Sequence, residues 1–220
     1  MASDMNDRHA ADVPAFYEKH TGDFDRERGR DLMERDHLAA AIEGLRPGAR
    51  VLDLGCGTGQ PIAAHLVSEG FRVTGVDVAE AMIVVCRGRF PGHEWIAADM
   101  RRLDLGRIFG AVVAWDSFFH LPRNDQRAMF PVFARHVAPG GSLLFTSGPS
   151  DGEVVGSLYG DPLFHASLAP AEYRSLLDAS GFDVVRHVVE DPDCGSHTVW
   201  LARRRVIVDP TSPAPLNRAP

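Results

Sequence analysis

Short runs of apolar and β-branched residues alternate with amphipathic stretches between residues 50 and 147. Runs of this kind, bounded by glycine, proline or aspartate, predict buried strands, and apolar residues spaced three to four positions apart predict the helices between them. The repetition of strand and helix predicts a doubly wound, mostly parallel sheet with right-handed crossovers. The expected strands cover 50–55, 71–77, 93–99, 110–116 and 141–147.

The flanking segments complete this α/β pattern. Strands are expected over 182–191 and 197–204, and the five residues between them are too few for a crossover helix, so these strands should pair antiparallel. Residues 8–46 carry apolar side chains at helical spacing. Residues 149–168 are rich in glycine and are expected to form a lid or substrate loop.

We therefore expect three parts in the chain. Residues 1–46 form an N-terminal helical cap of the same domain, and residues 47–207 form the ligand-binding core. Residues 208–220 form a proline-rich tail that is expected to be extended.

Composition and charge narrow the possible partners. The formal net charge of −7 disfavours nucleic acid, because binding to phosphates depends on basic surface. No apolar run approaches the roughly 18 residues of a membrane span, and the polar, acidic N-terminus lacks the features of a signal peptide. The three cysteines have no CxxC spacing and suggest neither disulfides nor zinc. We expect a cytoplasmic protein, a monomer or homodimer, that acts on a small molecule without a metal.

Aspartates stand at or near the ends of four successive predicted strands, at Asp53, Asp77, Asp99 and Asp116. Ligands of open α/β sheets bind outside these carboxyl ends. Several acids there favour a cationic or hydroxyl-rich ligand and would repel a diphosphate. Aspartate also ends strands through turn chemistry alone, but four in succession favour a binding site.

A glycine-rich turn follows the first predicted strand, with Gly55, Gly57 and Gly59 in the pattern G-x-G-x-G. Gln60 stands where the third glycine of a dinucleotide-binding turn would be, and Asp53 is awkwardly placed for a diphosphate. A tight turn that binds nothing and a nicotinamide site remain the alternatives at this point.

The sequence Asp53-Leu54-Gly55-Cys56-Gly57-Thr58-Gly59 matches the motif (D/E)-x-G-x-G-x-G of the class I S-adenosylmethionine-dependent methyltransferases. Over about residues 47–204 the chain resembles this family, which also shows in the segments "VTGVD", "IAADM", "VVAWDSFFHLP" and "VAPGGSLLF". The resemblance implies a Rossmann-like fold with a seven-stranded sheet, an antiparallel last strand and an N-terminal helical cap. It also implies S-adenosyl-L-methionine as cofactor, S-adenosyl-L-homocysteine as product, and transfer of a methyl group to an O, N or C atom of a small molecule. Because the sequence has no evident metal-ligand cluster, we expect an in-line displacement without a metal.

The resemblance and the chemistry of the cofactor together predict the cofactor-binding residues. Asp77 is expected to hold the ribose hydroxyls, Asp99 to accept from the adenine amino group, and Asp53 to attract the ammonium group. The glycines let backbone N–H groups approach the methionine carboxylate. Met82 has core packing as its alternative role. The predicted set is Asp53, Gly55, Cys56, Gly57, Gly59, Asp77, Val78, Met82, Asp99, Met100 and Trp115.

The catalytic candidates are Asp116 and His120, with His120 either a general base or a loop cap. A base is needed only if the acceptor is a protonated hydroxyl or amine. The predicted substrate-binding residues are Phe24, Phe118, Phe119, Tyr159, His165 and His197. The sequence "DSFF" replaces the (D/N/S)-P-P-(Y/F) motif of enzymes that methylate nucleic-acid bases. Two other functions stay open: a catalytically silent cofactor-binding accessory protein and a nicotinamide-dependent oxidoreductase.

Overall fold

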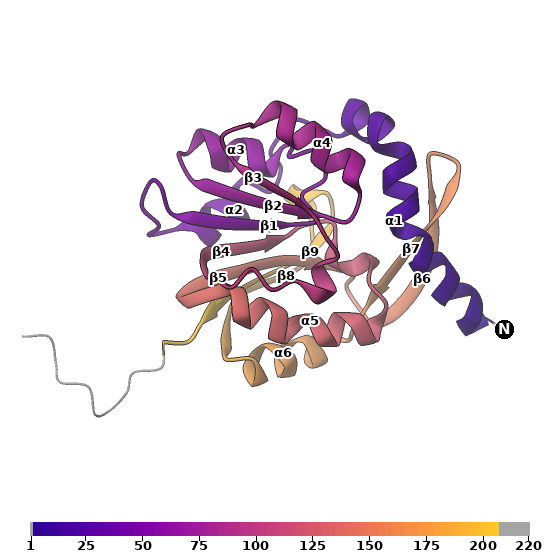
Figure 1. The fold of residues 1–220 in the computed structure, drawn as a ribbon. Helices are drawn as coiled ribbons and strands as arrows, with labels where there is room; N and C mark the ends of the chain where they lie inside the picture. The colour runs from indigo at the N-terminus through magenta and orange to yellow at the C-terminus, as the bar shows by residue number, and fades with distance from the viewer. Residues whose placement is uncertain (1, 207–220) are drawn as a thin grey trace, which may run out of the picture.

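A seven-stranded sheet forms the centre of the computed structural model, which describes residues 2–206 (Figure 1). The order across the sheet is β3-β2-β1-β4-β5-β9-β8, and β9 alone runs opposite to the other six strands. The predicted doubly wound sheet and the antiparallel C-terminal strand are confirmed. Its strands are β1 (Arg50–Leu54), β2 (Arg72–Asp77), β3 (Glu94–Ala97), β4 (Phe109–Ala114), β5 (Val137–Ser147), β8 (Phe182–Asp191) and β9 (His197–Arg204).

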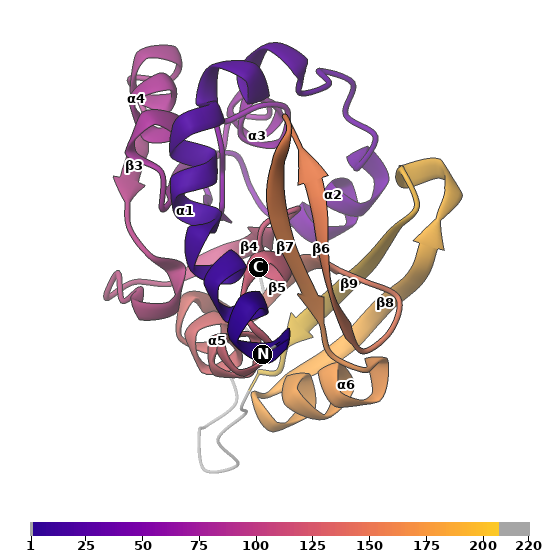
Figure 2. The same ribbon diagram turned by 90° about the vertical axis from the view of Figure 1, so that its right-hand side faces the viewer.

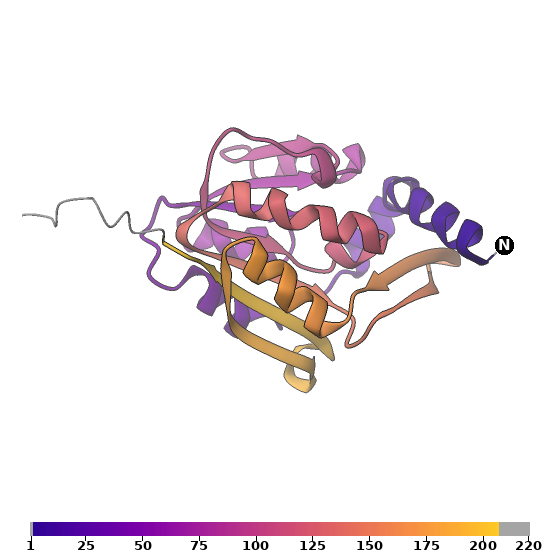
Figure 3. The same cartoon turned by 90° about the horizontal axis from the view of Figure 1, so that it is seen from below.

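Helices cover both faces of the sheet, as Figures 1 and 3 show. Side chains alternate between the faces along each strand: Leu52 and Leu54 pack with α5 and α6, while Val51 packs with α2 and α3. The helices are α1 (Ala2–Glu27), α2 (Arg35–Ile42), α3 (Ile62–Ser68), α4 (Glu80–Arg89), α5 (Arg123–His136) and α6 (Pro170–Ala179), with short 3₁₀ helices η1 (Met100–Arg102), η2 (Phe118–His120) and η3 (Pro192–Cys194).

The segment expected as a lid or substrate loop is a β-hairpin, so the expectation of a loop was wrong, whereas its role at the substrate stays a prediction. It consists of β6 (Gly152–Leu158) and β7 (Asp161–Ser167), which pair with each other apart from the main sheet. The turn residues Tyr159 and Gly160 both have positive φ, 53° and 83°, as a two-residue hairpin turn requires. The pair Tyr-Gly gives a weaker turn signal than Asn-Gly, and the hairpin packs against the distant α1.

Helix α1 lies between α4 and the hairpin, as Figure 2 shows. On one side, the Arg89 guanidinium donates to both carboxylate oxygens of Asp25, at 3.0 and 2.9 Å. On the other, Lys19 and His20 contact the Asp161 carboxylate at 2.6 and 2.7 Å. These contacts hold α1 over the carboxyl ends of the central strands.

The N-terminal region is helical as expected, in two helices joined by residues 28–34. The proposed division at residues 46 and 207 stays a prediction, and the tail 208–220 lies outside the described residues. Within residues 2–206, none of the helices combines the length and apolar character needed to cross a membrane.

Candidate active site

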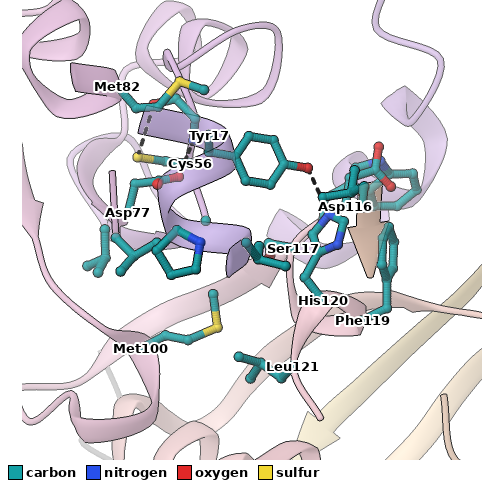
Figure 4. Close-up of a pocket in the computed structure, with 18 of the residues that line it drawn as sticks. Tyr17, Cys56, Asp77, Met82, Met100, Asp116, Ser117, Phe119, His120 and Leu121 are labelled. Carbon is teal, nitrogen blue, oxygen red and sulfur yellow. Dashed lines mark hydrogen bonds between the residues drawn. The ribbon is translucent and has the colours of Figure 1, made fainter. Parts of the chain in front are cut away.

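A cavity of about 630 Å³ opens at the carboxyl ends of β1, β2 and β4, beneath α1 (Figure 4). The chain leaves β1 toward β2 on one side and reaches β4 on the other, so the cavity lies at the switch point of the sheet. The predicted site residues on its wall are Phe24, Asp53, Gly55, Cys56, Gly57, Asp77, Val78, Met82, Asp99, Met100, Trp115, Asp116, Phe119, His120, His165 and His197.

The structure does not bring three of the predicted residues to this wall. A Cβ on Gly59 would lie 2.9 Å from the Phe90 ring, so this glycine permits packing of the turn against α4. Phe118 is fully buried in the core and packs edge-on against Phe145. Tyr159 lies at the hairpin turn, where its ring stacks on an aromatic side chain of α1 at 6.3 Å between centroids.

Two further glycines of the turn after β1 have positive φ and leave little space for a side chain. A Cβ on Gly55, where φ is 72°, would lie 2.1 Å from Cβ of Ser117. A Cβ on Gly57, where φ is 52°, would lie 3.1 Å from the Phe24 ring. Glycine is therefore required here both by the backbone conformation and by close packing.

Asp77 is held by backbone donors. Its Oδ2 accepts from the Gly57 N–H at 2.9 Å, and its Oδ1 accepts from the Ala79 N–H at 3.0 Å. Burial raises the pKa of this carboxyl, against the opposing effect of these hydrogen bonds. Each carboxylate oxygen has a further lone pair, so the oriented group can accept from two vicinal hydroxyls.

Asp99 is already engaged by Arg101. It accepts from the Arg101 backbone N–H at 2.9 Å and from the guanidinium, with a shortest distance of 2.6 Å. Burial opposes ionisation of Asp99, but these bonds outweigh it and lower the pKa of the carboxyl. A contact with an adenine amino group therefore requires Arg101 to give up one of its bonds.

Asp53 and Glu34 form a buried acidic pair without a cation in contact. Asp53 is 3% exposed, and burial, followed by the charges of Asp77 and Glu34, raises its pKa to about 7. Glu34 is 1% exposed, and neither of its carboxylate oxygens has a hydrogen-bond partner. Burial also raises the pKa of Glu34. The pair thus favours a ligand that brings a positive charge.

Asp116 lies between two basic groups. Its Oδ1 is 2.7 Å from Nε2 of His197, and its Oδ2 accepts from the Arg28 guanidinium at 3.1 Å. Burial opposes ionisation, but these partners lower the pKa of Asp116. The contact with Asp116 in turn raises the pKa of His197. The indole N–H of neighbouring Trp115 is buried without a partner.

Tyr17 reaches across the cavity to His120, whose Nε2 is 2.8 Å from the phenolic oxygen (Figure 4). The Nδ1 of His120 lies 2.8 Å from the Phe164 carbonyl oxygen, which can only accept, so Nδ1 carries the proton. Burial lowers the pKa of His120 to about 4, so the imidazole is neutral at pH 7. Nε2 therefore accepts, and the Tyr17 hydroxyl is the donor.

Sequence reasoning missed Tyr17, Arg28 and Glu34. A signal existed for Tyr17, because Val13, Tyr17 and Phe24 recur at helical spacing and indicate a buried face of α1. Arg28 and Glu34 stand in a charge-rich stretch that is typical of solvated sequence. Only the fold places them beside the strand ends.

Comparison with known proteins agrees with this arrangement. Residues 51–141 match the family model described as a methyltransferase domain. The chain is 34% identical over 121 residues to dTDP-3-amino-3,4,6-trideoxy-alpha-D-glucopyranose N,N-dimethyltransferase of Streptomyces venezuelae, covering 53% of this chain and 51% of the relative. It is 26% identical to an O-methyltransferase of Pyrenophora dematioidea, covering 84% and 82%. The chain spans about half the length of the first curated relatives it matches.

Solved structures share the fold over most of the chain. The sugar N-methyltransferase of Streptoalloteichus sp. superposes with a TM-score of 0.64 at 26% identity, covering 83% of this chain and 92% of that one. The amino pentose methyltransferase of Micromonospora echinaspora, solved with S-adenosylmethionine bound, gives 0.62 at 24% identity, covering 81% and 94%. With the first-strand motif and the sheet order, these likenesses show that residues 51–141 resemble a methyltransferase domain, within a chain that has the fold of S-adenosylmethionine-dependent methyltransferases.

Proposed function

We propose that this protein transfers the methyl group of S-adenosyl-L-methionine to an O, N or C atom of a small-molecule acceptor and releases S-adenosyl-L-homocysteine. The observation that carries the proposal is the charge of the cavity wall. The glycine turn, the oriented Asp77 carboxylate and the buried Asp53 line the cavity together at the switch point of the sheet, and the charge of the buried Glu34 acts on Asp53.

The wall fits the parts of this cofactor. Asp77 is placed to accept from the ribose hydroxyls, and the turn at Gly55 and Gly57 to approach the methionine carboxylate. The ammonium group supplies a positive charge next to Asp53, and this charge favours ionisation of a carboxyl whose pKa burial raises to about 7. The apolar side chains Val78, Met82 and Met100 complete this half of the cavity.

The bound cofactor supplies an electrophilic methyl group on a sulfonium, whose positive charge disperses as the group leaves. The chain then has little new charge to stabilise, and its contribution is alignment of the acceptor with the methyl carbon and sulfur. Helix α1 covers the cavity and excludes water from the methyl group. The proposed displacement uses no metal ion.

Two measurements test this proposal. S-adenosylhomocysteine should bind the purified protein and raise its melting temperature, whereas NAD should do neither. In the second measurement, labelled cofactor should transfer its methyl group to at least one member of a library of small-molecule acceptors. Stabilisation by NAD alone would favour an oxidoreductase, and cofactor binding without transfer to any acceptor would favour a silent accessory protein. Three expectations remain predictions: that the protein does not bind nucleic acid, that it is a monomer or homodimer, and that it is cytoplasmic.

A further inference from the structure

The half of the cavity away from the glycine turn is largely apolar. We call it the acceptor chamber: the wall formed by α1, residues 119–122 and the hairpin β6–β7. Its apolar side chains include Val13, Phe119 and Leu163. A chamber of this kind favours an apolar ligand, because apolar area removed from water contributes about 25 cal/mol per Å².

The cavity wall offers no free cation among the residues that the structure describes. The Arg28 guanidinium and His197 both contact Asp116. The Arg101 guanidinium contacts Asp99 and Asp125, at 2.6 and 2.7 Å. A phosphate group would have to displace a carboxylate from one of these cations, and the wall as a whole carries five aspartates but only two arginines.

The phenolic oxygen of Tyr17 lines the chamber and can accept a hydrogen bond from a ligand. The Tyr17 proton is directed to Nε2 of His120, which is fixed as an acceptor by the Phe164 carbonyl. Toward a ligand, the phenolic oxygen can therefore act as a hydrogen-bond acceptor but not as a donor. It can accept from an N–H or O–H of a ligand, and it gives nothing to an ether or a carbonyl.

We propose that the acceptor is an uncharged, largely apolar molecule whose methyl-accepting atom carries an N–H or O–H that donates to the Tyr17 oxygen. This inference rests on the proposed function. It also separates this chain from the Streptomyces venezuelae relative, whose name specifies a sugar nucleotide, because the chamber holds no free cation for a diphosphate.

The proton balance follows from the same geometry. The acceptor atom forms a bond to the methyl carbon as the carbon–sulfur bond breaks, and that electron pair neutralises the sulfonium. The acceptor proton passes to the Tyr17 oxygen, the Tyr17 proton passes to Nε2 of His120, and the imidazolium then releases a proton to water. Tyr17 and His120 thus remove a proton that becomes acidic only as the methyl group arrives.

Binding of matched probes to the complex with S-adenosylhomocysteine tests the inference. The probes are naphthol, its methyl ether, naphthyl phosphate and thymidine diphosphate, measured by calorimetry. We expect naphthol to bind five- to tenfold more tightly than the ether, the ratio that one neutral hydrogen bond gives. Both phosphates should bind at least about a hundredfold more weakly than naphthol, because an anion in the chamber loses hydration without gaining a cation.

Two variants show where the preference originates. Tyr17→Phe should abolish the preference for naphthol over the ether and leave the affinity for S-adenosylhomocysteine unchanged. Tyr173→Phe is the matched control: it removes a buried hydroxyl that accepts from the Leu168 N–H at 3.1 Å in the core, and it should keep the preference.

The failures are distinguishable. If S-adenosylhomocysteine does not bind, the proposed function fails. If it binds, but the phosphates bind as tightly as naphthol, naphthol and its ether bind equally, or none of the probes binds, the proposed acceptor class is wrong while the proposed function stands.

Discussion

Replacing Asp53 by asparagine should stabilise the empty protein at alkaline pH and weaken its hold on the cofactor. Asp53 is 3% exposed, and burial is the main cause that raises its pKa from 3.8 to about 7. This shift corresponds to about 4 kcal/mol, an upper bound on what ionising the group costs the empty fold. Asparagine keeps nearly the same shape without the charge.

The pH dependence has a definite sign. Below pH 3.8 the carboxyl holds its proton in both the folded and the unfolded chain, so its contribution to stability is fully present. Between pH 3.8 and about 7 the unfolded chain binds fewer protons, so stability falls as the pH rises. Asp53→Asn has no carboxyl to ionise at this position, so its stability does not fall in this way. Its free energy of unfolding should therefore rise relative to that of wild type by about 2 to 3 kcal/mol between pH 5 and pH 8.

Thermal unfolding without ligand measures this difference, which should appear as a relative rise of about 5 to 10 °C in melting temperature. Calorimetry with S-adenosylhomocysteine measures the predicted effect on binding. Its affinity for wild type should increase as the pH rises through 7, and the variant should bind at least about tenfold more weakly, with no such increase. Parallel pH dependences of stability in the two proteins would refute the assignment of a buried, proton-holding acid at Asp53.

Three further changes probe the turn, the ribose acid and the histidine. Gly55→Ala should cost more than about 2 kcal/mol of unfolding free energy, because its Cβ would lie 2.1 Å from Ser117, whereas Gly88→Ala in α4 has open space and should be neutral or stabilising in the same denaturant titration. Asp77→Ala should weaken S-adenosylhomocysteine about a hundredfold by calorimetry, because the hydroxyl acceptor and the partner of the Gly57 N–H are both lost; unchanged affinity would remove Asp77 from the cofactor site. Imidazole NMR should show His120 neutral, with its proton on Nδ1, from pH 8 to pH 5, and its contribution to stability should be lost as the pH falls from 6.5 toward 4. A titration near pH 6.5 would contradict the burial of His120, and a neutral ring protonated on Nε2 would contradict the direction of the Tyr17 hydrogen bond.

The cofactor half of the site was predictable because local sequence determines it. Asp53 lies next to the last residue of β1, and the glycine-rich turn follows at once, so the backbone of the turn and the acid lie close together. Short apolar runs likewise indicated the buried strands of the sheet. The acids Asp77 and Asp116 follow from the same rule, since carboxyl ends of parallel strands meet at one edge.

The acceptor half was not predictable in this way, because its contacts join segments far apart in the chain. His120 was identified as a candidate base, but its role changes once the distant Phe164 carbonyl fixes its tautomer and burial lowers its pKa. Phe118 occupies an apparently equivalent place in the motif, yet it points into the core. Within a 3₁₀ helix, adjacent side chains face different directions, and only the surrounding packing decides which one reaches the cavity.

Helix α1 couples the two halves of the site. It places Phe24 against the glycine turn and Tyr17 against His120, while Arg28, just beyond its end, holds Asp116. Because the same helix is fixed by Asp25 on one side and by contacts with the hairpin on the other, it cannot move away from the cofactor without also withdrawing Tyr17 from the acceptor. Under the proposed function, alignment of the acceptor with the methyl group would therefore depend on the position of α1 over the cavity.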